Sequence, residues 1–137
     1  MAWLMVAVLC YATTQPIPYR HKKHIAAGLK CKDCHTGPDP GERMTLPAAP
    51  KCIGCHPTMA GIKQPIAWKR ICAVAAGVYW SHRTHTNAGI ECETCHGDVS
   101  KMDVMTRVKD ITSMTACMDC HRERNAGLGC ELCHEGK

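Results

Sequence analysis

Residues 21–35 read HKKHIAAGLKCKDCH, and residues 82–96 repeat the pattern as HRTHTNAGIECETCH. Both stretches fit H-[KR]-x-H-x-x-A-G-[LI]-x-C-x-x-C-H, and a tyrosine precedes each of them, at Tyr19 and Tyr79. Internal repetition of this kind indicates a duplicated structural unit. The sequence therefore predicts two related units, each with a pair of histidines ahead of a cysteine motif.

Every C-x-x-C element in the chain is followed directly by histidine. The five motifs are motif 1 (CKDCH, 31–35), motif 2 (CIGCH, 52–56), motif 3 (CETCH, 92–96), motif 4 (CMDCH, 117–121) and motif 5 (CELCH, 130–134). Zinc sites and disulfide frameworks do not require this adjacency, because a zinc-binding histidine normally lies farther along the chain. In C-x-x-C-H, two thiols attach haem covalently and the histidine ligates its iron. The sequence therefore predicts five c-type haems.

These motifs supply the predicted attachment and ligand residues. The attachment residues are Cys31, Cys34, Cys52, Cys55, Cys92, Cys95, Cys117, Cys120, Cys130 and Cys133, and the motif ligands are His35, His56, His96, His121 and His134. Two of the 12 cysteines lie outside the motifs, Cys10 and Cys72. A disulfide between these two, packing of Cys72 as a small apolar side chain, and lipidation of Cys10 remain open.

The composition predicts a fold that depends on its cofactors. The chain has 137 residues, no phenylalanine and only 4% aromatic residues, so a core of side chains would be thin. Chains of this kind usually need disulfides, a metal or a cofactor to stabilise the fold. We expect a small, mostly irregular protein with short α-helices near the motifs, little or no sheet, and stacked haems as its core. The predicted organisation is a dihaem unit at 16–63, a connector at 64–75 and a trihaem unit at 76–137.

The charge does not indicate a nucleic-acid partner. The formal net charge of the polypeptide is +5, with 17 lysines and arginines against 12 acidic residues. Each haem brings two propionates, which the basic residues are expected to balance. No basic run is interleaved with aromatic residues, as it is in many nucleic-acid-binding proteins.

Residues 1–15 form an apolar segment that we interpret as a membrane anchor or a signal. The segment has no basic n-region and is shorter than the roughly 20 residues that span a bilayer. Because c-type haems are attached on the outer side of the bacterial inner membrane, we expect a periplasmic protein, anchored to that membrane. An extracellular filament is the alternative location.

Four histidines lie outside the motifs, and all belong to the two H-x-x-H pairs: His21, His24, His82 and His85. Haem iron takes two axial ligands, and an attachment motif supplies one of them. Two imidazoles three residues apart can point to different haems. Each pair is therefore predicted to serve two irons.

This arrangement resembles the class III multihaem cytochromes c, which are small periplasmic electron carriers. In that family the first histidine of the pair ligates the haem of the following motif, and the second reaches a later haem. The resemblance implies the pairs His21 with His35, His24 with His56, His82 with His96, and His85 with His121.

One axial ligand is missing from this set. Nine histidines provide nine ligands, whereas five six-coordinate haems need ten. The family's trihaem members carry a further histidine before their middle motif, but the chain reads DITSMTACMDCH at 110–121. We predict Met114 as the substitute on the haem of His134, with Met105 and Met102 as weaker candidates. An open iron, the N-terminal amine, a lysine or a ligand from a partner protein remain alternatives.

The leading functional prediction is electron transfer, not catalysis. The expected partners are other redox proteins: a membrane quinol-oxidising complex, a photosynthetic reaction centre or a soluble cytochrome. Two alternatives remain. A small multihaem reductase would use the ligand-short fifth haem, and a subunit that assembles with copies of itself would form a conducting filament.

Overall fold

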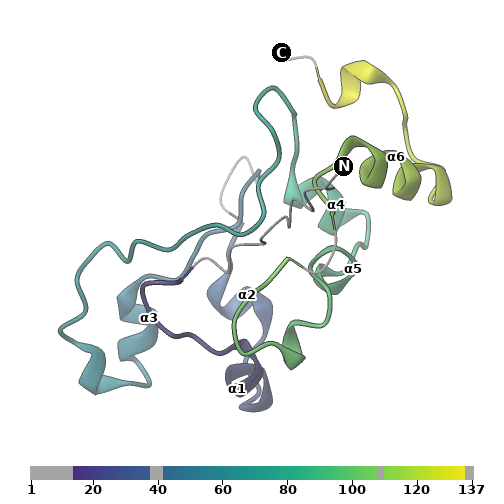
Figure 1. Cartoon of the computed structure of the whole chain (residues 1–137). Helices are drawn as coiled ribbons and strands as arrows, with labels where there is room; N and C mark the ends of the chain where they lie inside the picture. The colour runs from purple at the N-terminus through teal and green to yellow at the C-terminus, as the bar shows by residue number, and fades with distance from the viewer. Residues whose placement is uncertain (1–13, 38–41, 108–109, 135–137) are drawn as a thin grey trace, which may run out of the picture.

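The computed structural model describes residues 14–37, 42–107 and 110–134 of the chain (Figure 1). Within these ranges the elements are α1 (His21–Ala26), α2 (Cys31–Cys34), α3 (Ala49–Ile53), η1 (Pro57–Met59), α4 (His82–Asn87), α5 (Cys92–His96), η2 (Val99–Lys101), α6 (Met114–Glu123) and η3 (Cys130–Leu132). The described residues contain no β-strand. This confirms the predicted class, a small fold of short helices and irregular segments without a sheet.

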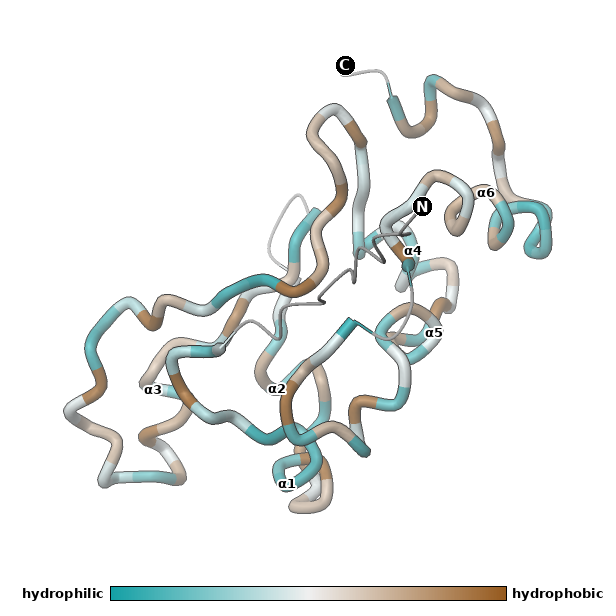
Figure 2. The backbone as a smooth tube through the Cα atoms, in the orientation of Figure 1, coloured by the Kyte–Doolittle hydropathy of each residue, from teal (hydrophilic) through white to brown (hydrophobic). Residues whose placement is uncertain are grey.

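Few side chains in the described ranges are buried. Ala49, which is 2% exposed, is the one buried apolar residue among them, and large side chains such as Leu132 and Val104 are about half exposed. Figure 2 shows hydrophobic residues spread along the whole trace instead of gathered at one centre. Since burial of apolar surface is the main driving force of folding, this polypeptide needs a further source of cohesion.

The repeated A-G-[LI] element ends a helix in the same way in both units. After α1, the Gly28 N–H donates to the Ile25 carbonyl at 2.9 Å, and the Leu29 N–H donates to the His24 carbonyl at 3.1 Å. This is a Schellman motif, in which the residue after the C-cap adopts a left-handed conformation. Gly28 fills that position with a φ of +90°.

The same ending follows α4 and α6, which both lie in the predicted second unit. After α4, Ile90 donates to the His85 carbonyl at 3.1 Å, and Gly89 has a φ of +78°. After α6, Ala126 donates to the His121 carbonyl at 2.8 Å, and Asn125 takes the left-handed position with a φ of 52°. Three predicted iron ligands thus occupy the same place in a helix end, and their backbone geometry is fixed by the same hydrogen bonds.

Replacing Gly28 by alanine should lower the free energy of unfolding by about 1–2 kcal/mol, because a Cβ disfavours the left-handed conformation. The space around Gly28 is open, so no steric clash adds to this cost. Gly61→Ala is the matched control, since its surroundings are equally open and its φ is not left-handed. Equal destabilisation of both variants in denaturant titrations would contradict the role of the Schellman motif.

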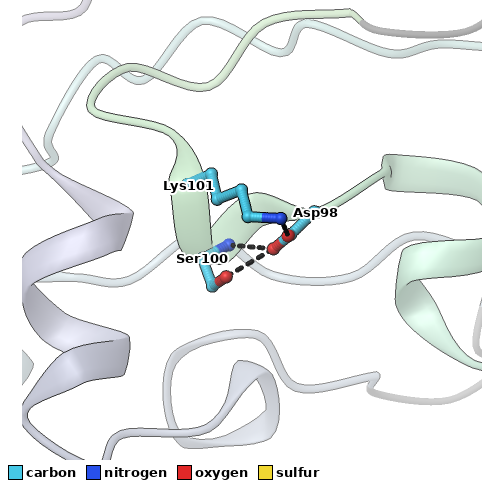
Figure 3. Close-up of polar contacts among 3 residues, drawn as sticks. All are labelled: Asp98, Ser100 and Lys101. Atoms are coloured by element: carbon cyan, nitrogen blue, oxygen red, sulfur yellow. Dashed lines mark hydrogen bonds and ion pairs between the residues drawn. The ribbon is translucent and has the colours of Figure 1, made fainter.

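A cap at Asp98 defines η2 (Figure 3). Its carboxylate accepts hydrogen bonds from the Ser100 backbone at 3.2 Å and from the Ser100 hydroxyl, and it pairs with Lys101 at 2.7 Å. Hydrogen bonds from Lys101 and then Ser100 hold the pKa of the Asp98 carboxyl below its ordinary value. The cap keeps the chain in a tight turn directly after motif 3.

This turn also joins the two units. η2 packs against α1, where the Lys22 N–H donates to the Met102 carbonyl at 3.0 Å. Gln15, the residue before the first predicted unit, is tied in turn to the predicted connector, because its side chain exchanges two hydrogen bonds with the Lys69 backbone, of 2.8 and 3.0 Å. The helix that carries the first H-x-x-H pair, α1, is thus anchored outside its own motifs.

Candidate haem sites

The structure brings eight of the nine histidines together in four pairs. The ring centroids are 6.4 Å apart for His21 and His35, 6.1 Å for His24 and His56, 6.4 Å for His82 and His96, and 6.2 Å for His85 and His121. Each pair joins one histidine of an H-x-x-H sequence to one histidine of an attachment motif. These are the four pairings that the resemblance implied.

The spacing within the pairs suits a single iron between two imidazoles. A metal–nitrogen bond of about 2.0 Å, the length of zinc–imidazole bonds, and about 1.1 Å from nitrogen to ring centroid give two opposed ligands a centroid separation of about 6.2 Å. The observed range is 6.1–6.4 Å. Imidazoles in direct contact would lie closer than this. The residues present therefore fit the haem that the motifs imply.

The pairs fall into two geometric classes. The rings are nearly parallel in the pairs that contain motif 1 and motif 3, with interplanar angles of 12° and 6°. They are twisted in the pairs that contain motif 2 and motif 4, with angles of 67° and 43°. The relative orientation of the two axial imidazoles influences the electronic structure of ferric haem, so the two classes should be spectroscopically distinct.

A loop between motifs 1 and 2 orients one imidazole in each parallel pair. Nδ1 of His35 lies 2.8 Å from the Thr45 carbonyl, and Nδ1 of His82 lies 2.8 Å from the Glu42 carbonyl. A carbonyl oxygen only accepts, so Nδ1 carries the hydrogen and Nε2 is left to bind iron. Hydrogen bonds of this kind fix the ring and increase its basicity as a ligand.

Helix geometry orients the second histidine of each H-x-x-H pair. Nδ1 of His24 donates to the Arg20 carbonyl, and Nδ1 of His85 donates to the Ser81 carbonyl, both over 2.8 Å and four residues back along the chain. These acceptors are the N-cap residues of α1 and α4. No residue type in the sequence predicts these contacts, because all four acceptors named so far are backbone carbonyls.

Two buried imidazole nitrogens among the described residues lack this second contact. Nδ1 of His21 and Nδ1 of His96 are buried and make no hydrogen bond with the described residues. Burial, followed by neighbouring histidines, lowers the pKa of both rings. Each parallel pair therefore combines one hydrogen-bonded imidazole with one that is held by packing.

Aromatic side chains supply part of that packing. Tyr19 stacks on His24 at 4.3 Å and meets His21 edge-on at 4.8 Å. In the second unit this role belongs to Trp80, 3.9 Å from His85 and 5.4 Å from His82. Trp80, and not the tyrosine that precedes the second stretch, is therefore the counterpart of Tyr19.

The distance along the chain to the first histidine explains why Trp80, and not Tyr79, packs on these rings. Trp80 and Tyr19 each precede the first histidine of their pair by two residues, whereas Tyr79 precedes it by three and is 60% exposed. Burial raises the pKa of Tyr19 to about 12, with smaller contributions from charge interactions with Cys34 and Cys52 and from a hydrogen bond with Cys34. Tyr19 thus lies between the first H-x-x-H pair and the thiols of motifs 1 and 2.

Tyr19→Leu should lower the free energy of unfolding by about 0.5–1.5 kcal/mol beyond the loss of buried area, since aromatic pairs contribute that much. Tyr19→Phe keeps the stacking and loses only the hydroxyl, so it is the matched control. We expect the leucine variant, and not the phenylalanine variant, to alter the electron paramagnetic resonance (EPR) signals of the ferric haems. Identical spectra for both variants would contradict an orienting role for the ring.

No disulfide joins the cysteines among the described residues. Cys72 is half-buried, whereas Cys10 lies outside the described residues, so the disulfide and lipidation alternatives are not tested. No group of three or more His, Cys, Asp or Glu side chains in the described ranges is arranged to hold a metal ion by itself.

The fifth site differs from the other four. His134 is exposed and faces no other imidazole among the described residues. Met114, the predicted substitute, is the first residue of α6 and is 63% exposed. Methionine ligation at His134 stays a prediction.

Most of the predicted N-terminal anchor, residues 1–13, lies outside the described residues. Among the residues that the structure describes, no helix is both long and apolar enough to cross a membrane.

Comparisons with known proteins agree with the geometry of the site. The family described as cytochrome c554 and c-prime matches residues 40–97, which contain motifs 2 and 3. The multiheme cytochrome c subunit of a menaquinone reductase from Nitratidesulfovibrio vulgaris is 27% identical over 126 residues, covering 74% of this chain. Both findings support a multihaem cytochrome c. They support covalently bound haem c and a part in electron transport, and the chain spans 60% of the length of that relative.

Proposed function

We propose that the chain holds five covalent c-type haems and relays electrons, one at a time, between redox proteins on the periplasmic side of a membrane. The observation that carries this proposal is the set of four imidazole pairs at 6.1–6.4 Å, each of which includes an attachment-motif histidine. Four sites with two protein ligands leave no axial position for a substrate. Such sites are suited to electron exchange without bond formation.

The chain's own residues define what each site can do. Bound haem c supplies a reversible one-electron change at its iron. The motif cysteines would hold the group covalently, the paired histidines would ligate its iron, and the Thr45 and Glu42 carbonyls fix the imidazole rings of His35 and His82. A reduced donor protein would lose one electron and an oxidised acceptor would gain it, with no bond formed or broken.

We further propose that the chain works as a subunit of a membrane-associated complex, with residues 1–15 as its anchor or signal. The named relative is a subunit of a menaquinone reductase, which supports a redox complex as the setting. Its partner would then be a quinol-oxidising complex, and a reaction centre, a soluble cytochrome or further copies of this chain are the alternatives.

The fifth site supports a second candidate function. Because His134 faces no second imidazole among the described residues, its haem would take a different second ligand, for which Met114 is the predicted residue, or would be open to a small molecule. Methionine ligation would raise the potential of this site above that of the bis-histidine sites. An open iron would instead make the chain a small reductase.

Three measurements on the holoprotein, produced with a haem-attachment system, test both proposals. Intact mass should show five covalent haems per chain. EPR of the oxidised form should show two classes of low-spin ferric signal, one from the parallel and one from the twisted pairs. Carbon monoxide should leave all haems of the reduced protein unchanged if Met114 ligates the fifth iron. Binding at about one haem in five would favour the reductase, and a count below five would contradict the pentahaem proposal.

A further inference from the structure

The two short helices with H-x-x-H sequences each connect two motifs. On α1, His21 faces motif 1 and His24 faces motif 2. On α4, His82 faces motif 3 and His85 faces motif 4. Because the two histidines of a helix are only three residues apart, motifs 1 and 2 are neighbours, and so are motifs 3 and 4.

The loop between motifs 1 and 2 connects the first of these couples to the second. Its Thr45 carbonyl lies 2.8 Å from Nδ1 of His35 in motif 1, and its Glu42 carbonyl lies 2.8 Å from Nδ1 of His82, which faces motif 3. The Arg83 guanidinium of α4 also donates to the Gly37 carbonyl, two residues after motif 1, at 3.5 Å. Motifs 1 and 3 are therefore neighbours, although about 60 residues separate them in the sequence.

Motif 5 adjoins motif 4. Burial raises the pKa of the Cys117 thiol of motif 4, and the thiols of Cys133 in motif 5 and Cys95 in motif 3 add to the shift. A hydrogen bond of 2.7 Å from the Tyr79 N–H to the Cys133 carbonyl holds motif 5 beside the segment that leads into α4. No corresponding contact joins motif 5 to motif 2 in the described ranges.

We propose that the five attachment motifs lie in single file in the order 2, 1, 3, 4, 5, so that motifs 2 and 5 are the two ends. Figure 1 agrees with this order, since α3 lies at one extreme and the yellow C-terminal segment at the other, with α2 and α5 between them. The inference rests on the proposed function, because the order matters only if the motifs hold haems.

The polypeptide covers the end motifs less than the inner ones. His56 and His134, at the two ends, are exposed, whereas His35, His96 and His121 are half-buried. The ends are therefore the positions that donor and acceptor proteins can approach most closely. The sequence order of the motifs does not reveal this, because it places motif 1 at one end.

The direct test is to locate the irons in crystals of the holoprotein by anomalous diffraction and to assign each one to its motif from the density. We expect the iron of motif 1 to have those of motifs 2 and 3 as its nearest neighbours, and the iron of motif 5 to have only that of motif 4. Any other neighbour order, including a closed ring in which motif 5 lies beside motif 2, would overturn the proposal. A haem count below five would contradict the proposed function. The neighbour order of the irons that are present would still show whether the motifs follow the proposed order.

A matched pair of variants on α1 tests the order in solution. Methionine raises the reduction potential of the haem that it ligates, and this haem is therefore reduced first. The electron that it gains adds negative charge, which lowers the reduction potentials of the neighbouring haems. His24→Met, at an end, should shift one other midpoint in an EPR-monitored redox titration, and His21→Met, inside the file, should shift two. The same number of shifted midpoints in both variants would overturn the order. If the EPR spectrum of the unmodified protein contained no bis-histidine signals, the proposed function would instead be contradicted.

Discussion

The His24→Ala variant should bind one more carbon monoxide per chain than the unmodified protein when both are reduced. His24 lies opposite His56 at 6.1 Å, so its removal would leave the haem iron proposed at motif 2 with a single protein ligand. A ferrous haem with a free axial position binds carbon monoxide, whereas a bis-histidine haem does not. Absorption spectroscopy, referenced to total haem, gives the difference directly and cancels any contribution from the fifth site.

Lys23→Ala is the matched control for this variant. Lys23 lies between the two histidines on the same helix, and its side chain is exposed and belongs to no imidazole pair. Carbon monoxide uptake by the control should equal that of the unmodified protein. If His24→Ala also bound no additional carbon monoxide, the assignment of His24 to the iron of motif 2 would be wrong.

Removing the attachment cysteines should have very different effects at the centre and at an end of the molecule. The variant with Cys92→Ala and Cys95→Ala loses the haem of motif 3, between motifs 1 and 4. We expect it to unfold at a temperature on the order of 10 °C lower or to fail to accumulate, because each kcal/mol shifts a melting temperature by about 2–8 °C. The described residues have almost no buried apolar side chains to compensate.

The matched variant, with Cys130→Ala and Cys133→Ala, removes the haem of motif 5 at one end. This protein should accumulate with four haems and retain the EPR signals of all four bis-histidine sites. Intact mass and thermal unfolding monitored by absorption would compare the two variants. A motif 5 variant that is as unstable as the motif 3 variant would show that motif 5 is also part of the structural centre.

The attachment residues stay a prediction from the sequence, one that rests on the spacing that covalent attachment requires. A C-x-x-C-H motif needs two thiols and one imidazole within about one helical turn, so residue types alone identify it. The pairing of distal histidines came from resemblance to a family, and the ring distances agree with it. The absence of strands among the described residues also follows from the sequence, which lacks long runs of alternating apolar residues.

Other parts of the site have no sequence signature. The acceptors of His35 and His82 are backbone carbonyls in a loop, and any residue type presents a carbonyl. Trp80 was missed because residue type suggested Tyr79 as the equivalent of Tyr19, whereas the distance to the following histidine decides which ring stacks on it. A comparison of positions counted back from the first histidine of each pair would have identified Trp80, whereas a comparison of residue types does not.

The contact between motifs 1 and 3 also bears on the origin of the chain. The Lys22 N–H of α1 donates to the Met102 carbonyl after motif 3, and Nδ1 of His82 on α4 donates to the Glu42 carbonyl after motif 1. Each contact joins the H-x-x-H helix of one predicted unit to the segment that follows the first attachment motif of the other. Contact between identical patches is the mark of an isologous, two-fold interface. An ancestor with a single dihaem unit would have formed this contact as a homodimer, and gene duplication with fusion would have enclosed the dimer within one chain.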